Sequence, residues 1–281
     1  MNSPWIAGLV ALFLWWFSTG AILVVLRHAD RGGNTAHRRA VLFTAPLALF
    51  GVWGLATSFA MPSVPGAYLG FVAAIAVWGW LEHAFLAGVI AGPNRRPCPP
   101  GAPEWERFVR AWGTIAYSEM ALTAVLIALV WAAWDAENTV GLWSFAVLYL
   151  ARISAKLNVY LGVPNINTEF LPRPVRHLAS HFRVAPMNRL FPVSVTALSL
   201  ATGCWLERIW AQEAGSAGAV GFALLAALTA LALVEHWLMV LPLPDAKLWR
   251  WMLPDPSPAT ARPDKRKVAG QRGRHGFRPS V

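Results

Sequence analysis

The stretch from Ala67 to Gly92 reads AYLGFVAAIAVWGWLEHAFLAGVIAG, and Glu82 and His83 are its only side chains that can carry a charge near neutral pH. This apolar run is longer than the roughly 20 residues that a helix needs to cross the hydrocarbon core of a bilayer. In lipid, every backbone N–H and C=O must be paired within the protein, and a helix achieves this alone. The stretch therefore predicts a transmembrane helix.

Further runs of the same character predict about seven spans in all. Hydrophobic residues make up 56% of the 281-residue chain and charged residues 14%, whereas a soluble domain has about 25% charged residues. The 16 Trp residues agree, because Trp favours the membrane–water interfaces. The predicted fold class is therefore all-α, a polytopic transmembrane helix bundle. The expected spans are Trp5–Leu26, Ala40–Ala60, Ala67–Gly92, Ala111–Trp134, Leu142–Val163, Leu190–Ile209 and Gly218–Leu243.

The loops between these spans differ in charge, and this difference predicts the orientation. Alternate loops are rich in arginine, whereas Met61–Gly66 and Asp135–Gly141 contain no Lys or Arg and the loop after the sixth span has only Arg208. The positive-inside rule then places the N-terminus outside and the C-terminus in the cytoplasm. The expected location is a bacterial inner membrane. The arginines on the cytoplasmic side are Arg27, Arg31, Arg38, Arg39, Arg95, Arg96, Arg107, Arg110, Arg173, Arg176, Arg183 and Arg189.

The chain divides into a transmembrane helical domain, residues 1–253, and a basic cytoplasmic tail, residues 254–281. The tail is rich in Pro, Gly, Arg and Lys and has no apolar periodicity, so we expect it to be disordered. The net charge of +10 follows from loops and tail, and its placement excludes nucleic-acid binding as the leading interpretation. Cys98 and Cys204 form no CxxC pair, which gives no redox or zinc motif.

Several ionisable or polar residues fall inside the predicted spans, where such groups are costly and usually functional. Once each span has a direction, Glu82, Glu119, Lys156 and Glu235 all lie roughly 10–15 Å from the cytoplasmic ends, at 1.5 Å per residue. The sequence therefore predicts one polar layer in the cytoplasmic half of the bilayer. Its candidate members are Glu82, His83, Glu119, Arg152, Lys156, Asn158, Glu235 and His236.

Three interpretations of this layer remain open: an ion network that holds the bundle together, a pigment, quinone or metal site, and a proton or ion path. The weak metal candidates are Glu82, Glu119, Glu235 and His236. Di-iron bundles use Glu-x-x-His, whereas Glu82-His83 and Glu235-His236 are adjacent pairs whose side chains diverge by about 100° on a helix. A neutral His in an apolar span could also ligate the magnesium of a chlorin. The catalytic residues stay unassigned.

The segment after the fifth span is a candidate cytoplasmic docking loop. Pro164 removes a backbone donor and ends the helix, and Asn165 and Asn167 favour turns. His177 and His181 are four residues apart, a spacing that can bind a metal on a helix but also fits an interfacial amphipathic helix. The candidate docking residues are Pro164, Asn165, Asn167, Glu169, Arg176, His177, His181 and Asn188.

Six blocks in order along the chain resemble the PuhE family of photosynthetic complex assembly proteins, encoded near reaction-centre genes in purple phototrophs. The match departs before Glu82 and Glu119, where Leu81 and Ser118 stand in place of the family's His, which argues against a family-wide Glu/His metal site. The blocks are WWFSTG at Trp15–Gly20, GPNRRPCPP at Gly92–Pro100, SAKLNVYLGVPN at Ser154–Asn165, MNRLFP at Met187–Pro192, EHW at Glu235–Trp237 and LPLPDAKLWRW at Leu241–Trp251.

This resemblance implies a membrane assembly factor for the reaction centre or light-harvesting complex. Its partners would be the lipid bilayer, complex subunits and other assembly factors, and its cofactor bacteriochlorophyll or a metal ion. The alternative is a membrane enzyme that acts on a chlorin, carotenoid or quinone through the glutamates. A non-enzymatic role is the leading expectation.

Overall fold

The computed structural model describes residues 2–241, and these residues form a bundle of seven α-helices with two short 3₁₀ helices. The expected all-α fold class is confirmed. The basic tail, residues 254–281, lies outside the described residues, as does the end of the predicted domain beyond residue 241. The helices are α1 (Pro4–Phe43), α2 (Ala45–Ser58), α3 (Val64–Leu86), α4 (Glu104–Ala132), α5 (Val140–Leu161), η1 (Thr168–Phe170), η2 (Arg173–His181), α6 (Leu190–Trp210) and α7 (Ala217–Leu238).

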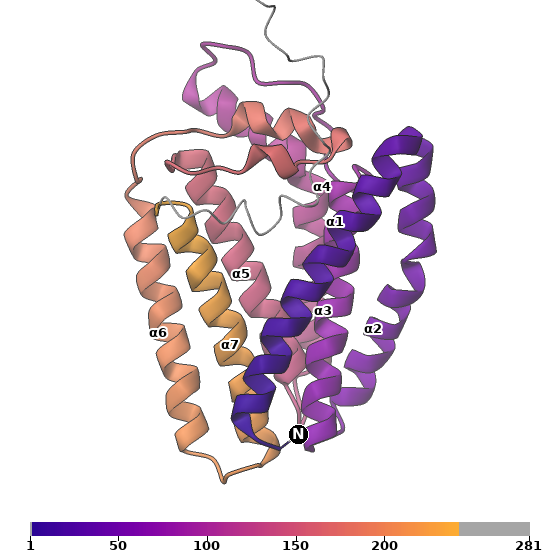
Figure 1. Cartoon of the computed structure of the whole chain (residues 1–281), viewed down its shortest axis with the longest axis vertical. Helices are drawn as coiled ribbons and strands as arrows, with labels where there is room; N and C mark the ends of the chain where they lie inside the picture. Colours follow the sequence, from indigo (N-terminus) through magenta and orange to yellow (C-terminus); the bar gives the residue numbers. More distant parts are fainter. Residues whose placement is uncertain (1, 242–281) are drawn as a thin grey trace, which may run out of the picture.

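The first two predicted spans correspond to one long helical segment that turns back on itself. Six segments of residues 2–241 are long and apolar enough to cross a membrane when Pro4–Ser58 is taken as one piece of 55 residues. Gly33, however, has φ 71° and ψ −163° and interrupts α1. In Figure 1 α1 rises to one end of the bundle and the chain then descends through α2. This segment therefore makes two passes.

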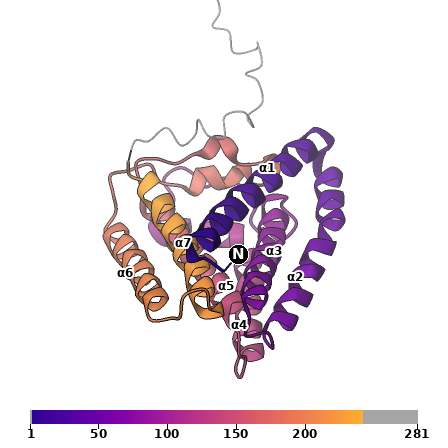
Figure 2. The same ribbon diagram turned by 60° about the horizontal axis from the view of Figure 1, so that its bottom comes forward.

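Helix α3 occupies the centre of the bundle and packs against α1, α2, α4, α5 and α7. Figure 2 shows α2 on one flank beside α3, and α6 on the opposite flank beside α7. Small residues allow the close contacts, because helices in lipid associate through packing rather than a hydrophobic driving force. A Cβ atom added to Gly54 of α2 would lie only 2.9 Å from the Cβ of Ala73 on α3. Deeper in the core, Trp78 of α3 meets Phe145 of α5 edge-on, with ring centroids 5.3 Å apart.

The outer surface is apolar in the way that contact with lipid requires. Large side chains such as Phe43, Phe50 and Leu200 are exposed there. At the end where α1 begins and α4 and α6 finish, Trp5, Trp131 and Trp210 are more than 80% exposed. Trp at this position marks a membrane–water interface. The bundle therefore has the lipid-facing surface and the aromatic border of a transmembrane protein.

The fold sends the loops of different charge to opposite ends of the bundle. The α2–α3, α4–α5 and α6–α7 connections lie at the end that carries the N-terminus (Figure 1), and these connections contain no Lys or Arg. The turn of α1, the α3–α4 loop and the η1–η2 segment lie at the other end, which we call the basic end. Which end faces the cytoplasm stays a prediction.

The helix boundaries differ from the predicted spans where local backbone chemistry decides them. The expected loop between Leu26 and Ala40 is helical on both sides of Gly33. Helix α3 stops at Leu86 rather than Gly92, because Gly88 adopts a left-handed φ of 72°. Helix α4 begins at Glu104, well before Ala111, and its polar first turns extend beyond the apolar run.

Candidate functional site

Arg152 on α5 is the centre of a buried ion cluster between α3, α4 and α5. Its guanidinium forms an ion pair with Glu82 of α3 and lies 3.4 Å from the Glu119 carboxylate of α4, measured from Nε to Oε1. It also donates a hydrogen bond to Ser118 Oγ at 3.1 Å. One turn along α5, Lys156 Nζ lies 2.5 Å from the same Glu119 oxygen. Two carboxylates thus meet two cations, and the cluster is electrically balanced.

Aromatic rings close the sides of this cluster. The Arg152 guanidinium carbon lies 4.9 Å from the ring centroid of Phe85, and Lys156 Nζ lies 4.5 Å from the same centroid. A cation within about 6 Å of an aromatic face is attracted by the ring quadrupole. The arrangement compensates the charges of Glu82, Glu119, Arg152 and Lys156 inside an apolar bundle.

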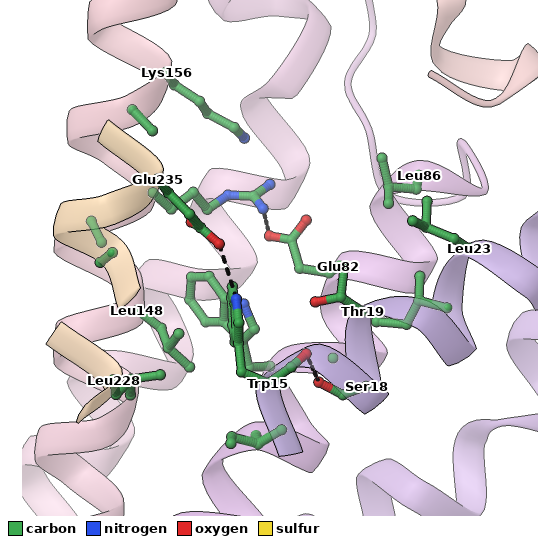
Figure 3. Close-up of a pocket in the computed structure, with 18 residues that line it drawn as sticks. Trp15, Ser18, Thr19, Leu23, Glu82, Leu86, Leu148, Lys156, Leu228 and Glu235 are labelled. Carbon is green, nitrogen blue, oxygen red and sulfur yellow. Dashed lines mark hydrogen bonds and ion pairs between the residues drawn. The ribbon is translucent and has the colours of Figure 1, made fainter. Parts of the chain in front are cut away.

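Glu235 of α7 belongs to a cavity beside the cluster but has a different partner. The cavity holds about 320 Å³ between α1, α3, α5 and α7. Figure 3 shows the Glu235 and Glu82 carboxylates pointing into it, with Lys156 above and Leu148 below in this view. Trp15 of α1 donates its indole N–H to Glu235 at 2.9 Å. This cavity, which we call the central cavity, therefore has apolar walls and a polar end.

His236 and Asn158 lie apart from the ion cluster and serve the helix contacts. His236 is buried, with Nε2 2.8 Å from Ser154 Oγ and Nδ1 2.8 Å from the Ala232 carbonyl. Both ring nitrogens are therefore engaged. The buried Asn158 amide donates to Ser194 Oγ at 2.9 Å, which ties α5 to α6.

His83 is the candidate of the polar layer that has a buried ring nitrogen without a hydrogen-bond partner among the described residues, a feature that His177 and His181 of the docking loop share. It is 3% exposed and lines a second, smaller cavity of about 240 Å³ between α1, α2 and α3, which we call the side cavity. Its Nδ1 lies 3.0 Å from Thr44 Oγ1 at the start of α2. Its Nε2 is buried and has no hydrogen-bond partner within residues 2–241. A buried polar atom without a partner is costly and requires an explanation.

The contacts of Thr44 favour one tautomer of His83. Thr44 Oγ1 lies 3.1 Å from the carbonyl oxygens of both Ala40 and Val41, either of which accepts its single proton. With the proton on a carbonyl, the hydroxyl oxygen accepts from His83 Nδ1, and Nδ1 then bears the ring proton. The unpartnered Nε2 consequently has a free lone pair. A metal-ligating His characteristically donates its other N–H to a nearby oxygen in this way.

The central and side cavities adjoin each other across the contact of α1 with α3. Ser18 and Ile22 of α1, and Ile75 and Gly79 of α3, line both of them. Glu82 faces the central cavity and the next residue, His83, lines the side cavity, as expected for neighbours on a helix. Among residues 2–241 no group of three or more His, Cys, Asp and Glu residues is placed to hold a metal ion.

Part of the candidate docking loop forms hydrogen bonds that hold the bundle together. Asn165 donates its side-chain amide to the Leu241 carbonyl at 2.8 Å, and Asn188 donates to the Gly162 carbonyl at 2.8 Å. His177 and His181 lie in a 3₁₀ helix rather than an α-helix, where residues four apart diverge by about 120°. Burial lowers the pKa of both imidazoles below the ordinary value. Among the candidate docking residues, the exposed ones are Pro164, Asn167, Glu169 and Arg176.

Sequence reasoning missed the residues that act as partners. Trp15, Thr44, Ser118 and Ser154 are uncharged, and nothing in their local pattern distinguishes them from other residues of an apolar helix. Trp15, Ser118 and Ser154 had been named only through the resemblance to the PuhE family, and Thr44 had not been named at all. Identifying these partners required the three-dimensional structure, which shows which residues are neighbours.

Comparisons with known proteins place this arrangement in a family. A relative from Rhodobacter capsulatus, described as "Uncharacterized 30.4 kDa protein in puhA 5'region", is 55% identical over 267 residues, which are 94% of this chain and 97% of the relative. No solved structure matches the chain. A family described as "Protein of unknown function (DUF3623)" matches residues 1–260. Because this match spans nearly the whole chain, the protein belongs to the DUF3623 family.

Proposed function

We propose that the protein is an inner-membrane factor in the assembly of photosynthetic complexes of a purple bacterium, and that it holds a magnesium tetrapyrrole such as bacteriochlorophyll through His83. The process is supported by the R. capsulatus relative, which is described as a protein in the puhA 5' region. The resemblance to the PuhE family agrees with this.

The unpartnered Nε2 of His83 is the observation that carries the ligand assignment. The magnesium of a tetrapyrrole would be held by a group with a free lone pair, and the neutral imidazole of His83 in its apolar site would supply one. Phe17 and Leu47, on the rim of the side cavity, are 56% and 48% exposed. Because the magnesium lies at the centre of the ring, a macrocycle held by His83 would fill the side cavity of about 240 Å³ and continue past this rim into lipid.

The ion cluster favours a role in binding a ligand over a role in acid–base catalysis. Glu82 and Glu119 both contact Arg152, and Glu119 also contacts Lys156. A carboxylate whose oxygens are occupied by fixed cations is a poor general base.

The ligand assignment is tested by purifying the full chain from a phototrophic host and measuring its absorbance spectrum per mole of protein. The wild type is expected to carry tetrapyrrole, and His83→Leu to retain at most about a tenth of it, since removal of an outer- or inner-sphere ligand costs 10–100-fold in affinity. His236→Gln is the matched control, because that buried imidazole has both nitrogens engaged. Equal tetrapyrrole in wild type and His83→Leu would overturn the role of His83.

The process is tested separately by deleting the gene. Assembled reaction centres are expected to fall while pigment synthesis continues. If a discrete pigment precursor accumulates instead, the protein is an enzyme of pigment synthesis and the assembly proposal fails.

A further inference from the structure

A cleft at the basic end is lined by three arginines from three separate segments. It holds about 550 Å³. Arg38 comes from the last turns of α1, Arg95 from the α3–α4 loop and Arg173 from the start of η2. All three are exposed. The rest of the lining is uncharged: Asn34, Val41, Leu42, Ala87, Gly88, Val89 and Pro174.

The positive charge of this arginine cleft is not compensated by the described part of the chain. Within residues 2–241 none of the three guanidiniums takes part in an ion pair. Asp30, an acidic residue near the cleft, accepts from the Arg173 backbone N–H at 3.2 Å and lies 3.0 Å from His37 Nε2. Three arginines that line one cleft whose wall has no carboxylate are a site for an anion.

The fold holds the cleft together through a close backbone contact. A Cβ atom added to Gly88 would lie 2.7 Å from the Cβ of Pro174, so the end of α3 touches the start of η2. Arg95 reaches back over this contact and donates from Nη2 to the Gly88 carbonyl at 2.8 Å. An arginine has five N–H donors in a planar fork, and the remaining ones stay available to a ligand.

An apolar margin shows what kind of anion fits. Leu42 and Val89, which line the cleft, are 73% and 41% exposed, and the next residue, Phe43, is 87% exposed. Leu42 lies one helical turn from Arg38, about 6 Å along the axis. The guanidiniums of the cleft therefore lie at the level of lipid headgroups. The apolar side chains of the margin continue from there towards the hydrocarbon core.

We propose that the arginine cleft binds the phosphodiester of an anionic membrane phospholipid. Planar guanidiniums pair with phosphate oxygens through two parallel N–H···O bonds, and basic pockets between transmembrane helices recognise anionic headgroups. The acyl chains follow Leu42 and Val89 into the bilayer. This site is separate from the pigment site, because none of its lining residues borders the central or side cavity.

The test titrates phosphatidylglycerol into the purified full chain in a non-ionic detergent and measures bound lipid by native mass spectrometry. Arg38→Gln/Arg173→Gln is expected to weaken binding at least about tenfold, because it removes charge-assisted hydrogen bonds. Arg39→Gln/Arg96→Gln is the matched control. It removes two exposed arginines at the same end that do not line the cleft, and binding should stay within about twofold of wild type.

Two further arms identify the source of the phosphate and the place of binding. If inorganic phosphate binds as tightly as phosphatidylglycerol, the ligand is a soluble anion and the lipid assignment is overturned. Equal binding of phosphatidylcholine, or an equal loss in both double variants, overturns specificity for the cleft. A photoactivatable phosphatidylglycerol on the wild type is expected to label peptides containing Leu42 or Val89; labelling confined to other helices would also overturn the proposal.

Discussion

At the scale of single residues, the buried charges are stable only as a set. Arg152 has 10% of its side chain exposed and Glu119 has 6%. Removing both charges from water costs free energy that offsets most of their attraction. A buried ion pair therefore contributes little net stability. Removing one member is a different matter, because the remaining charge is left in an apolar surrounding.

We therefore expect Arg152→Met to lower the free energy of unfolding by about 3–5 kcal/mol. The measurement is unfolding by sodium dodecyl sulfate in mixed micelles, followed by circular dichroism. Adding Glu82→Gln to Arg152→Met should recover part of the loss, because it removes the unpaired carboxylate. The exposed Arg39→Met serves as control, with a change below about 0.5 kcal/mol. A double variant less stable than Arg152→Met would contradict this account.

At the scale of helices, apolar length predicted where the chain crosses but not where each helix ends. The hydrocarbon core sets the number of apolar residues, so α5 and α6 agree with their predicted spans within two residues. The end of α3 depends instead on the left-handed backbone of Gly88. A glycine is common in apolar helices, and its sequence context does not reveal its φ angle.

Gly88→Ala is expected to destabilise the protein by about 1–2 kcal/mol or more, since a left-handed residue with a Cβ costs that much and the added atom would meet Pro174. Gly203 provides the comparison within α6, because an added Cβ would have no atom within 4 Å. Gly203→Ala should stabilise by about 0.5–1 kcal/mol. Both are measured by the same unfolding titration. Equal effects of the two substitutions would show that the backbone at Gly88 relaxes freely.

The sequence was enough to predict which charged residues form the candidate site, but it predicted only part of how they are arranged. Counting residues along oriented spans was enough to place Glu82, Glu119 and Lys156 at one depth, because helical rise is constant. Counting could not show that Glu235 bonds to Trp15, since depth says nothing about which helices are neighbours. Nor could it distinguish His83 from His236, because Thr44, the partner that orients His83, lies 39 residues away in the chain.

At the scale of the whole molecule, the separation of loop charge gives the bundle a direction. The loops at residues 59–63, 133–139 and 211–216 contain no Lys or Arg, and all three lie at the end opposite the arginine cleft. Cytoplasmic loops of membrane proteins carry the excess of Lys and Arg. We therefore expect the basic end, with its arginine cleft, to face the cytoplasm.

Cysteine labelling in spheroplasts measures this orientation. Cys98 lies at the basic end in the α3–α4 loop and is partly exposed, whereas Gln212 is exposed between α6 and α7. A membrane-impermeant maleimide should label Gln212→Cys, made in a Cys98→Ser/Cys204→Ser background, in intact spheroplasts. It should label Cys98, in a Cys204→Ser background, only after permeabilisation. The reverse pattern would show that the basic end faces outward.

The hydrogen bond from Trp15 to Glu235 joins residues 220 positions apart, and this separation constrains how the protein is made. Ribosomes add about 5–20 residues per second, so α1 waits in the membrane for roughly 10–40 s before α7 is synthesised. Even after α3 and α5 have been made, the central cavity lacks one of its four walls until α7 follows. A ligand that binds there can therefore enter from the side while the chain is still being translated, and α7 then closes behind it.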